Sequence, residues 1–442
     1  MTDAGILDSM RVQRRRALAM AVIFLLALLA RTALVTTFDP KDMGFSDVSY
    51  IEYAKNFSEG RGFYMERPYG PAGPDRVYAF RPPLFPFAWG LLYGITGGSY
   101  VPMWYGFAVL SAVGCVLVYR VGLRLFPDER AATIGGLICA VYPPLVFYGV
   151  NLMTEPFFIF FSVLTMLFLF RAWDLGRKRD AALAGLSFGL GMLSRSVLIG
   201  FAPFVAIWLL FRPSESGGKR RANWPLAACF GVALALTLAP WIVRNAVALH
   251  SFVVSTTDSG HGFYVANNPQ SLRDPRGFFV PNDWSFVLRP GDKQIGEVEM
   301  QRRLTSETFH YLTSHSVEWL GLVARRAIWF WRPWPHGEFV GAKRALIYGL
   351  SFLPLVPFML IGLVRAHARG RGCLAKYLLI DLLILYTWAI HAAILATLRY
   401  REPLMPFLIL FAGFAVAGLF FPKRAGETTR GLARPAVWDE GG

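Results

Sequence analysis

This sequence is poor in charge and in cysteine. Only 17% of its 442 residues are charged, whereas 55% are hydrophobic, and the mean hydropathy is +0.41. This composition excludes an ordinary soluble protein and predicts a membrane protein. The four cysteines show no CxxC or Cys/His spacing, which indicates neither a metal site nor a disulfide framework. They are Cys115, Cys139, Cys229 and Cys373.

Several other signals are also missing. No A-x-A-like site follows the first apolar run, so we do not expect a cleaved signal peptide. No internal repeat and no matched pair of broken half-helices stands out, which argues against an inverted-repeat transporter. The histidines show no ligand spacing such as HExxH, so we predict no cofactor and leave dependence on a divalent metal open. They include His261, His310, His315 and His336.

Apolar runs of about 20 residues recur along the chain, and each is long enough to cross a bilayer. The formal net charge of +16 is concentrated in short segments between these runs, where it sets orientation and does not indicate nucleic acid. The basic segments are 11–16, 120–130, 171–180, 212–221, 365–376 and 422–434. If all six are cytoplasmic, about ten crossings are needed and both termini lie inside. The predicted crossings are 17–38, 101–120, 132–150, 155–172, 181–196, 198–211, 224–243, 343–364, 375–396 and 403–421.

The remaining chain divides into two long outer segments, 39–100 and 245–342. Within the first, the Pro-rich apolar stretch 82–98 is short, and a crossing there would invert every later basic loop. We therefore predict that it is a helix lying at the outer interface. The expected organisation is an N-terminal transmembrane module (1–244) that includes the first outer loop, a large outer loop with interfacial helices (245–342), C-terminal transmembrane helices (343–421) and a cytoplasmic tail (422–442).

Two carboxylates fall at outer ends of this scheme. "SDVSYIEYAKNF" opens a helix in which Asp47, Tyr50 and Ala54 share one face. Glu155, in "NLMTEPFF", begins a predicted crossing and is followed by proline. Each residue also suits a helix start, where an acid stabilises free N–H groups. Ionisable side chains at membrane depth are costly, so both are candidate catalytic residues.

Arginines gather at the same outer ends, against the sign that orientation alone favours. They are Arg81, Arg195, Arg244, Arg399 and Arg401. A guanidinium fork can bind a phosphate through two hydrogen bonds, as a lipid-linked substrate requires. The alternative is that they anchor helix ends by snorkelling. Arg31, in the first crossing, fits either this set or internal helix packing.

The second outer segment contains further candidates. "STTDSGHGFYVANNP" has the Gly, Asn and aromatic content of a loop that can hydrogen-bond a sugar and stack on it, although ordinary turns have the same content. "RRAIWFWRPWP" is typical of an interfacial anchor. The predicted substrate-binding set is completed by Tyr50, Asn245, Asn267, Asn268 and Tyr400.

Together these pieces resemble the GT-C superfamily of glycosyltransferases, in particular bacterial relatives of family 39, which includes protein O-mannosyltransferases and the lipid A aminoarabinose transferase. The resemblance runs from the first crossing to the last and is carried by "SDVSYIEYA", "RPPLFP", "LMTEPFF", "GLSFGLGMLSRS", "APWIVRN", "VANNP" and "LRYREPLMP". It implies an all-α polytopic bundle with a helical first outer loop and a large irregular second one. It also implies acidic site residues at Asp47 and Glu155 and a basic one at Arg81.

The resemblance further implies that a sugar leaves a polyprenyl phosphate carrier and passes, with inversion, to a lipid, glycan or protein acceptor on the outer face. The aminoarabinose transferases have what resembles a Lys-Pro pair at the position of Arg81. The arginine here keeps the positive charge but changes the geometry with which a phosphate is bound. Val48 follows Asp47, so the acidic pair of protein O-mannosyltransferases is absent, which argues against protein mannosylation.

Our hypothesis is that Asp47 accepts the proton of the acceptor, or orients an acceptor that is already anionic. Arg81, Arg244 and Arg399 would hold the departing phosphate and Glu155 would support the pocket. Membrane lipids are the other expected partners, and the expected location is a bacterial inner membrane. A transporter or flippase of a lipid-linked or small anionic substrate remains an alternative, and a non-catalytic scaffold is a third.

Overall fold

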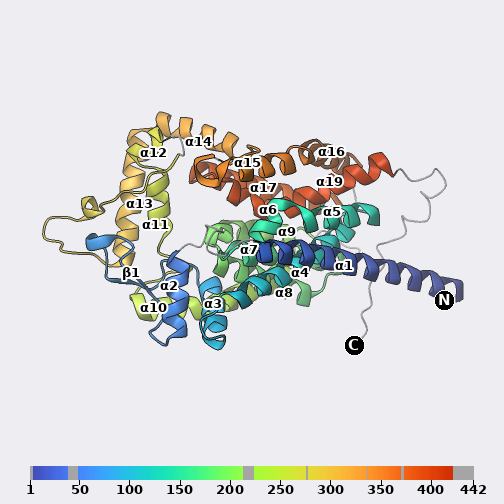
Figure 1. Cartoon of the computed structure of the whole chain (residues 1–442), viewed down its shortest axis with the longest axis horizontal. Coiled ribbons are helices and arrows are strands. Elements are labelled where there is room, and N and C mark those ends of the chain that lie inside the picture. The colour runs from blue at the N-terminus through green and yellow to red at the C-terminus, as the bar shows by residue number, and fades with distance from the viewer. Residues whose placement is uncertain are drawn as a thin grey trace.

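The computed structural model describes residues 3–37, 48–212, 223–274, 277–335, 337–369 and 373–421. It is a long bundle of helices with a smaller group of helices and loops at one end (Figure 1). The N-terminal end of α1 lies at the right of Figure 1, whereas α11, α12 and α13 lie at the left. The predicted all-α polytopic fold is confirmed.

The bundle contains most of the chain. Its elements are α1 (Asp3–Thr37), α4 (Val101–Leu125), α5 (Glu129–Val141), α6 (Pro143–Tyr148), α7 (Glu155–Leu175), α8 (Lys178–Ser194), η2 (Ser196–Phe201), α9 (Ala202–Leu210), α10 (Trp224–Leu249), α15 (Gly337–Phe352), α16 (Leu355–Arg369), α17 (Leu374–Ala393), α18 (Leu398–Arg401), η5 (Glu402–Leu404) and α19 (Met405–Phe420). Each predicted crossing corresponds to one or more of these elements.

Seven helical stretches within the described residues are long and apolar enough to cross a membrane. The three other predicted crossings are shorter in the structure. The one at 132–150 breaks after α5, because Tyr142 precedes Pro143 and takes an extended conformation. The one at 181–196 is α8, with 17 residues. The one at 198–211 becomes a 3₁₀ turn followed by α9, which has nine residues.

Small residues let the bundle helices approach closely. Gly176 ends α7 in the left-handed region, with φ +66°, so the chain can turn directly into α8. A Cβ built on Gly185 of α8 would lie 2.2 Å from the Phe230 carbonyl oxygen of α10. A Cβ built on Gly362 of α16 would lie even closer to the Phe411 carbonyl oxygen of α19. These positions exclude a larger side chain, and such contacts replace hydrophobic burial as the source of helix association in a membrane.

The basic segments assigned to one side of the membrane meet at one end of the bundle. Arg16 pairs with Glu129 at 3.3 Å, which joins the start of α1 to α5. Asp174 of α7 accepts from Lys376 at 2.6 Å and from Arg124 at 3.2 Å. Segments 213–221 and 422–434 of the same prediction lie outside the described residues.

The two long outer segments form a group of their own. The first contains α2 (Val48–Ser58), β1 (Met65–Glu66), η1 (Gly70–Ala72), β2 (Arg76–Val77) and α3 (Leu84–Ile95), and the second contains α11 (Ser259–Ala266), α12 (Pro269–Arg273), η3 (Ser285–Val287), α13 (Glu297–Ser314) and α14 (Ser316–Phe330). The strands pair antiparallel, with Met65 opposite Val77. Helix formation is confirmed for the stretch beginning near Tyr50 and for the Pro-rich stretch 82–98.

The second outer segment contains several helices. In α13, Met300, Leu304 and Leu312 are buried at a spacing of four or eight residues, which places them on one helix face. The two segments share a core in which Tyr53, Tyr69 and Phe80 from the first pack with residues of the second. Those residues include Val265, Trp284, Met300 and Leu304.

Candidate functional site

Glu155 is the centre of a buried charge cluster. Its carboxylate is fully buried at the first position of α7. Arg195 donates from Nη1 to Glu155 Oε1 at 2.8 Å, and Arg399 donates to the same oxygen from Nε. Within the described residues Glu155 Oε2 accepts no hydrogen bond. Two guanidinium groups against one carboxylate leave the cluster with a cationic excess, which favours an anionic ligand.

Breaks in helical structure bring these arginines to Glu155. Arg195 lies between α8 and η2, where its extended backbone ends the helix. Arg399 lies in the short helix α18, which precedes α19. Residues at such breaks can direct side chains into the end of a bundle, where a continuous helix would run past it.

An aromatic stack forms the wall beside Arg195. The Arg195 guanidinium lies 4.7 Å from the centre of the Tyr400 ring, within range of a cation–π interaction. The Tyr400 ring in turn stacks on the His391 ring, with centroids 4.3 Å apart and an interplanar angle of 11°. The arginine therefore has both an ionic and an aromatic partner, which fixes its direction.

Arg81 forms a second cationic position, on the outer group. Its Nη1 donates to Asp258 Oδ2 at 2.8 Å, and its Nε donates to Ser49 Oγ at 2.9 Å. The guanidinium lies 5.3 Å from the centre of the Tyr50 ring. Elements from both outer segments thus hold this arginine, because Ser49 and Tyr50 belong to α2 and Asp258 precedes α11.

Tyr50 connects the two cationic positions. It lies beside Arg81 and in the neighbourhood of Arg399. It belongs to a buried cluster with Phe85 and Leu152, and Phe157, two positions after Glu155, packs against that cluster. The structure therefore brings together six of the predicted site residues: Tyr50, Arg81, Glu155, Arg195, Arg399 and Tyr400.

The predicted catalytic residue Asp47 lies outside the described residues, so its role stays a prediction from sequence. The closest described side chain in the sequence is Ser49, two positions later, which binds Arg81. The start of α2 is thus anchored at the Arg81 position.

Arg244 and Asn245 hold the outer segments onto α10. Arg244 donates to the carbonyl oxygens of Tyr78 at 2.7 Å and Phe63 at 2.8 Å. Asn245 is fully buried and donates to the Val253 carbonyl oxygen at 3.1 Å. These contacts account for the side chains structurally, and their predicted substrate contacts remain untested.

Asn267 and Asn268 organise the turn between α11 and α12. Asn267 Oδ1 accepts from Arg326 at 3.0 Å. Asn268 caps α12 by accepting from the amides of Gln270 and Ser271, and its own N–H donates to Ser271 Oγ, which completes a capping box. Both asparagines are fully buried, so the turn is well defined. Sugar binding by this loop stays a prediction.

Arg401 points to another part of the bundle than Arg399. It is fully buried, donates to the Arg332 carbonyl oxygen at 2.8 Å and packs 3.7 Å from the centre of the Phe352 ring. The nearest carboxylate oxygen is that of Glu402, at 3.9 Å. Two arginines separated by one residue therefore serve different places.

Arg31 has the internal packing role that was one of its two alternatives. It is buried and donates to Ser111 Oγ at 2.6 Å and to the Ala140 carbonyl oxygen at 2.9 Å. It also lines a cavity with Cys115 and Pro406. This cation thus ties α1 to α4 and α5.

Sequence reasoning missed several charged residues of this region. Asp258 stands inside the quoted loop "STTDSGHGFYVANNP", but only the Gly, Asn and aromatic content was used. Glu402 lies inside "LRYREPLMP", where only the arginines and the tyrosine were considered from the sequence. Glu297 begins α13 and resembles any acid in a first helical turn. No three His, Cys, Asp or Glu side chains of the described ranges gather into a group that could hold a metal ion.

Residues 80–243 match the family model of dolichyl-phosphate-mannose-protein mannosyltransferases, a segment that includes Arg81, Glu155 and Arg195. No curated protein sequence matches this chain.

Among solved structures, the fold is similar to that of the oligosaccharyltransferase of Archaeoglobus fulgidus. The structure tethered to an acceptor peptide with the NVT sequon has a TM-score of 0.54 at 14% identity, covering 92% of this chain and 49% of that one. The complex with Zn and sulfate has a TM-score of 0.52 at 15% identity, covering 91% and 49%. This chain spans about half the length of that protein. This chain is thus similar to that mannosyltransferase family over residues 80–243, and it shares the fold of that oligosaccharyltransferase.

Proposed function

We propose that this protein is a membrane glycosyltransferase that takes a sugar from a polyprenyl phosphate carrier and transfers it to a lipid, glycan or protein acceptor. The observation that carries this proposal is the convergence of Arg195 and Arg399 on Glu155, with Arg81 across Tyr50. Such a group of guanidinium ions can stabilise a phosphate that gains negative charge as it leaves. The donor class in the name of the matching family supports this choice.

In the proposed reaction an acceptor oxygen attacks the anomeric carbon of the donor. The bond from that carbon to the phosphate oxygen breaks, and the carrier phosphate leaves with the electron pair. A single displacement inverts the configuration. Asp47 takes the acceptor proton, or orients an acceptor that is already anionic, while Arg81 and Arg399 hold the phosphate. Glu155 fixes Arg195 and Arg399 in direction before the donor binds.

The site is proposed to face the extracytoplasmic side, in a bacterial inner membrane, with both termini in the cytoplasm. The gathering of the basic segments at the end opposite the outer group supports this orientation. The family name points to protein acceptors, whereas the lack of a second acid at Val48 points away from them. The acceptor class is therefore kept as lipid, glycan or protein, and the sugar as hexose or pentose.

The test is incubation of the purified full chain with a panel of polyprenyl phosphate sugars, scored by release of the free carrier phosphate. A glycosyltransferase releases carrier with at least one sugar when an acceptor extract is present. A flippase leaves every donor intact and instead moves it between leaflets of a vesicle. A chain that does neither is not an enzyme of this class.

A further inference from the structure

The backbone that leads into Arg81 is held by side chains from three distant elements. Tyr78 N–H donates to Glu297 Oε2 at 2.8 Å, and the Tyr78 carbonyl oxygen accepts from Arg244 at 2.7 Å. Phe80 N–H donates to the Tyr53 hydroxyl at 3.1 Å. The side chains come from α13, α10 and α2, so this short segment is the point where the outer group is joined.

Ala79 completes the pattern. Its carbonyl oxygen accepts from Thr257 N–H at 2.8 Å, and its own amide nitrogen lies 3.5 Å from Glu297 Oε2. The Thr257 hydroxyl also lies 3.5 Å from that oxygen. One carboxylate oxygen thus faces Tyr78, Ala79 and Thr257 together.

Thr257 immediately precedes Asp258, the ion-pair partner of Arg81. Glu297 therefore contacts the chain two positions before Arg81 and one position before its partner. We infer that Glu297 is a positioning residue for the Arg81–Asp258 pair, setting the place of the guanidinium that receives the donor phosphate. This inference rests on the proposed function only for the identity of that ligand.

The environment of Glu297 agrees with a role beyond that of a surface acid. Its side chain is 5% exposed, and within the described residues its Oε1 accepts no hydrogen bond. Burial raises the pKa of this carboxyl to about 7. The charged and titratable groups acting on it are Arg244 of α10, Tyr53 of α2 and Tyr69 before η1. Burial also raises the pKa of both tyrosines well above its ordinary value, so they face Glu297 as neutral hydroxyls.

Two conservative variants distinguish the effect of the length of the Glu297 side chain from that of its negative charge. Glu297→Gln keeps the length and an acceptor oxygen, and its amide nitrogen replaces Oε1, which accepts no hydrogen bond from the described residues. Glu297→Asp keeps the charge but draws the carboxylate back by one methylene. A positioning role predicts that the Gln variant retains carrier release near the wild-type rate and that the Asp variant loses about ten- to a hundredfold. A role for the negative charge predicts the reverse order.

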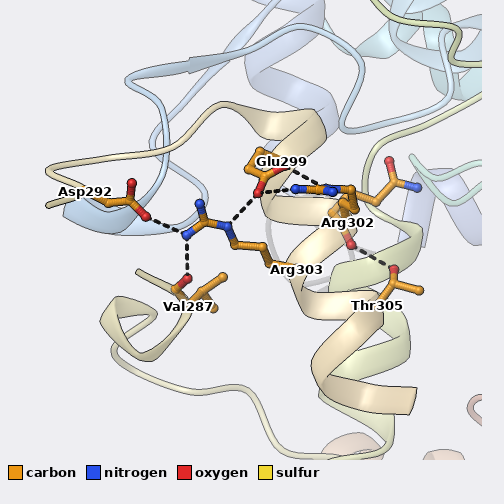
Figure 2. A network of polar contacts seen from close by, with 7 residues as sticks. Val287, Asp292, Glu299, Arg302, Arg303 and Thr305 are labelled. Atoms are coloured by element: carbon orange, nitrogen blue, oxygen red, sulfur yellow. Dashed lines mark hydrogen bonds and ion pairs between the residues drawn. The ribbon is translucent and has the colours of Figure 1, made fainter. Parts of the chain in front are cut away.

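Glu299 provides the matched control. It lies two positions further along α13, and Figure 2 shows that it accepts hydrogen bonds from Arg302 and Arg303 of the same helix. Arg303 in turn holds the preceding loop through Asp292 at 2.6 Å. Glu299→Asp therefore perturbs the same helix through a network that does not include the segment before Arg81. Carrier release by this control should stay within about twofold of the wild type.

Coupling to Arg81 distinguishes positioning from a general effect on folding. In an Arg81→Gln background, Glu297→Asp should cost little further activity, because the group that it positions is gone. Independent losses that multiply would overturn the inference, as would a Glu297→Asp variant that matches Glu299→Asp.

Hydrogen exchange of the Tyr78, Ala79 and Phe80 amides gives a readout without any donor. It should accelerate in Glu297→Asp and not in Glu297→Gln. Unchanged exchange would overturn the inference even if the wild type transfers sugar. If the wild type releases no carrier while exchange responds as expected, the proposed function fails and the positioning by Glu297 stands.

Discussion

Arg81 and Asp258 form an ion pair at 2.8 Å although they are 177 positions apart in the sequence. Both side chains are about one-quarter exposed, so the pair lies at the margin of the outer group and not in its core. The pair joins the first outer segment to the second, and its partial exposure leaves the guanidinium open to solvent. This arrangement suits a guanidinium that is oriented by Asp258 before a phosphate binds and that then interacts with both groups.

Replacing Arg81 by Gln should lower carrier release by about 10²–10³-fold, because a cation that stabilises the leaving phosphate is lost. Arg81→Lys should retain part of the activity, since a point charge replaces the fork. The control is Arg67→Gln, on the same segment, where the pair with Asp75 is mostly exposed. Initial rates of carrier release from a polyprenyl phosphate sugar measure the effect of each substitution. Equal rates for Arg81→Gln and the control would remove Arg81 from the site.

Replacing Glu155 by Gln should destabilise the folded protein by about 3–5 kcal/mol, because two arginines would then share no counter-charge in a buried place. Thermal unfolding in detergent measures the effect. The matched control is Glu129→Gln, which breaks a partly exposed pair with Arg16 and should cost about 1 kcal/mol or less. Similar shifts for the two variants would mean that the Glu155 cluster is solvated and not buried.

Asp47→Asn should lower sugar transfer by about 10²–10⁴-fold while the protein still inserts and folds, because only the acceptor of the proton is removed. Transfer to a defined acceptor is the measurement, with Asp75→Asn as the exposed control on the same segment. Retained transfer at the wild-type rate would take Asp47 out of the catalytic role.

The pKa of Glu297, raised to about 7 by burial, predicts a pH dependence of stability. Its folded pKa exceeds the ordinary value of 4.5, so the folded state binds the proton more tightly. Its contribution is fully present below pH 4.5 and is lost as pH rises to about 7, by up to about 3 kcal/mol. The melting temperature of the wild type relative to Glu297→Gln should therefore fall across this window.

For Glu299 we expect a pH dependence of stability of the opposite sign, so this residue serves as the comparison. Hydrogen bonds from Arg302 and then Arg303 lower the pKa of this carboxyl to about 2. Its contribution is present above pH 4.5 and is lost as pH falls toward 2. A wild type whose stability relative to Glu297→Gln is flat between pH 4.5 and 7 would show that Glu297 is solvated.

Arg31→Met should lower the melting temperature and leave the rate of carrier release per folded molecule unchanged. The substitution leaves the Ala140 carbonyl oxygen without its donor, at a cost of about 1–3 kcal/mol. Thermal unfolding and the release assay on the same preparation measure the two effects. Lost activity in a protein of unchanged stability would instead place Arg31 in the site.

The class of fold and the elements of the bundle follow from the amino-acid sequence alone. Apolar runs located α1, α4, α7, α10 and α17, because an uninterrupted run of this length has to satisfy its backbone as a helix. The helix bounds differ from those expected where proline ends a helix. Tyr142 and Pro143 divide one predicted crossing, and Pro240 lies within α10 without ending it. Local sequence does not decide between these outcomes, since neighbouring helices decide whether a freed carbonyl finds a partner.

The sequence also identified the residue types of the candidate site, because charge near membrane depth is rare and easily noticed. Only the tertiary structure decided which of them meet. Arg399 reaches Glu155 and Arg401 does not, although one residue separates them, because successive positions on a helical turn face different neighbours. The roles of Asp258 and Glu297 at the Arg81 position follow only from the way in which the two outer segments pack together. Ion pairs across such separations depend on packing, and packing is a property of the whole chain.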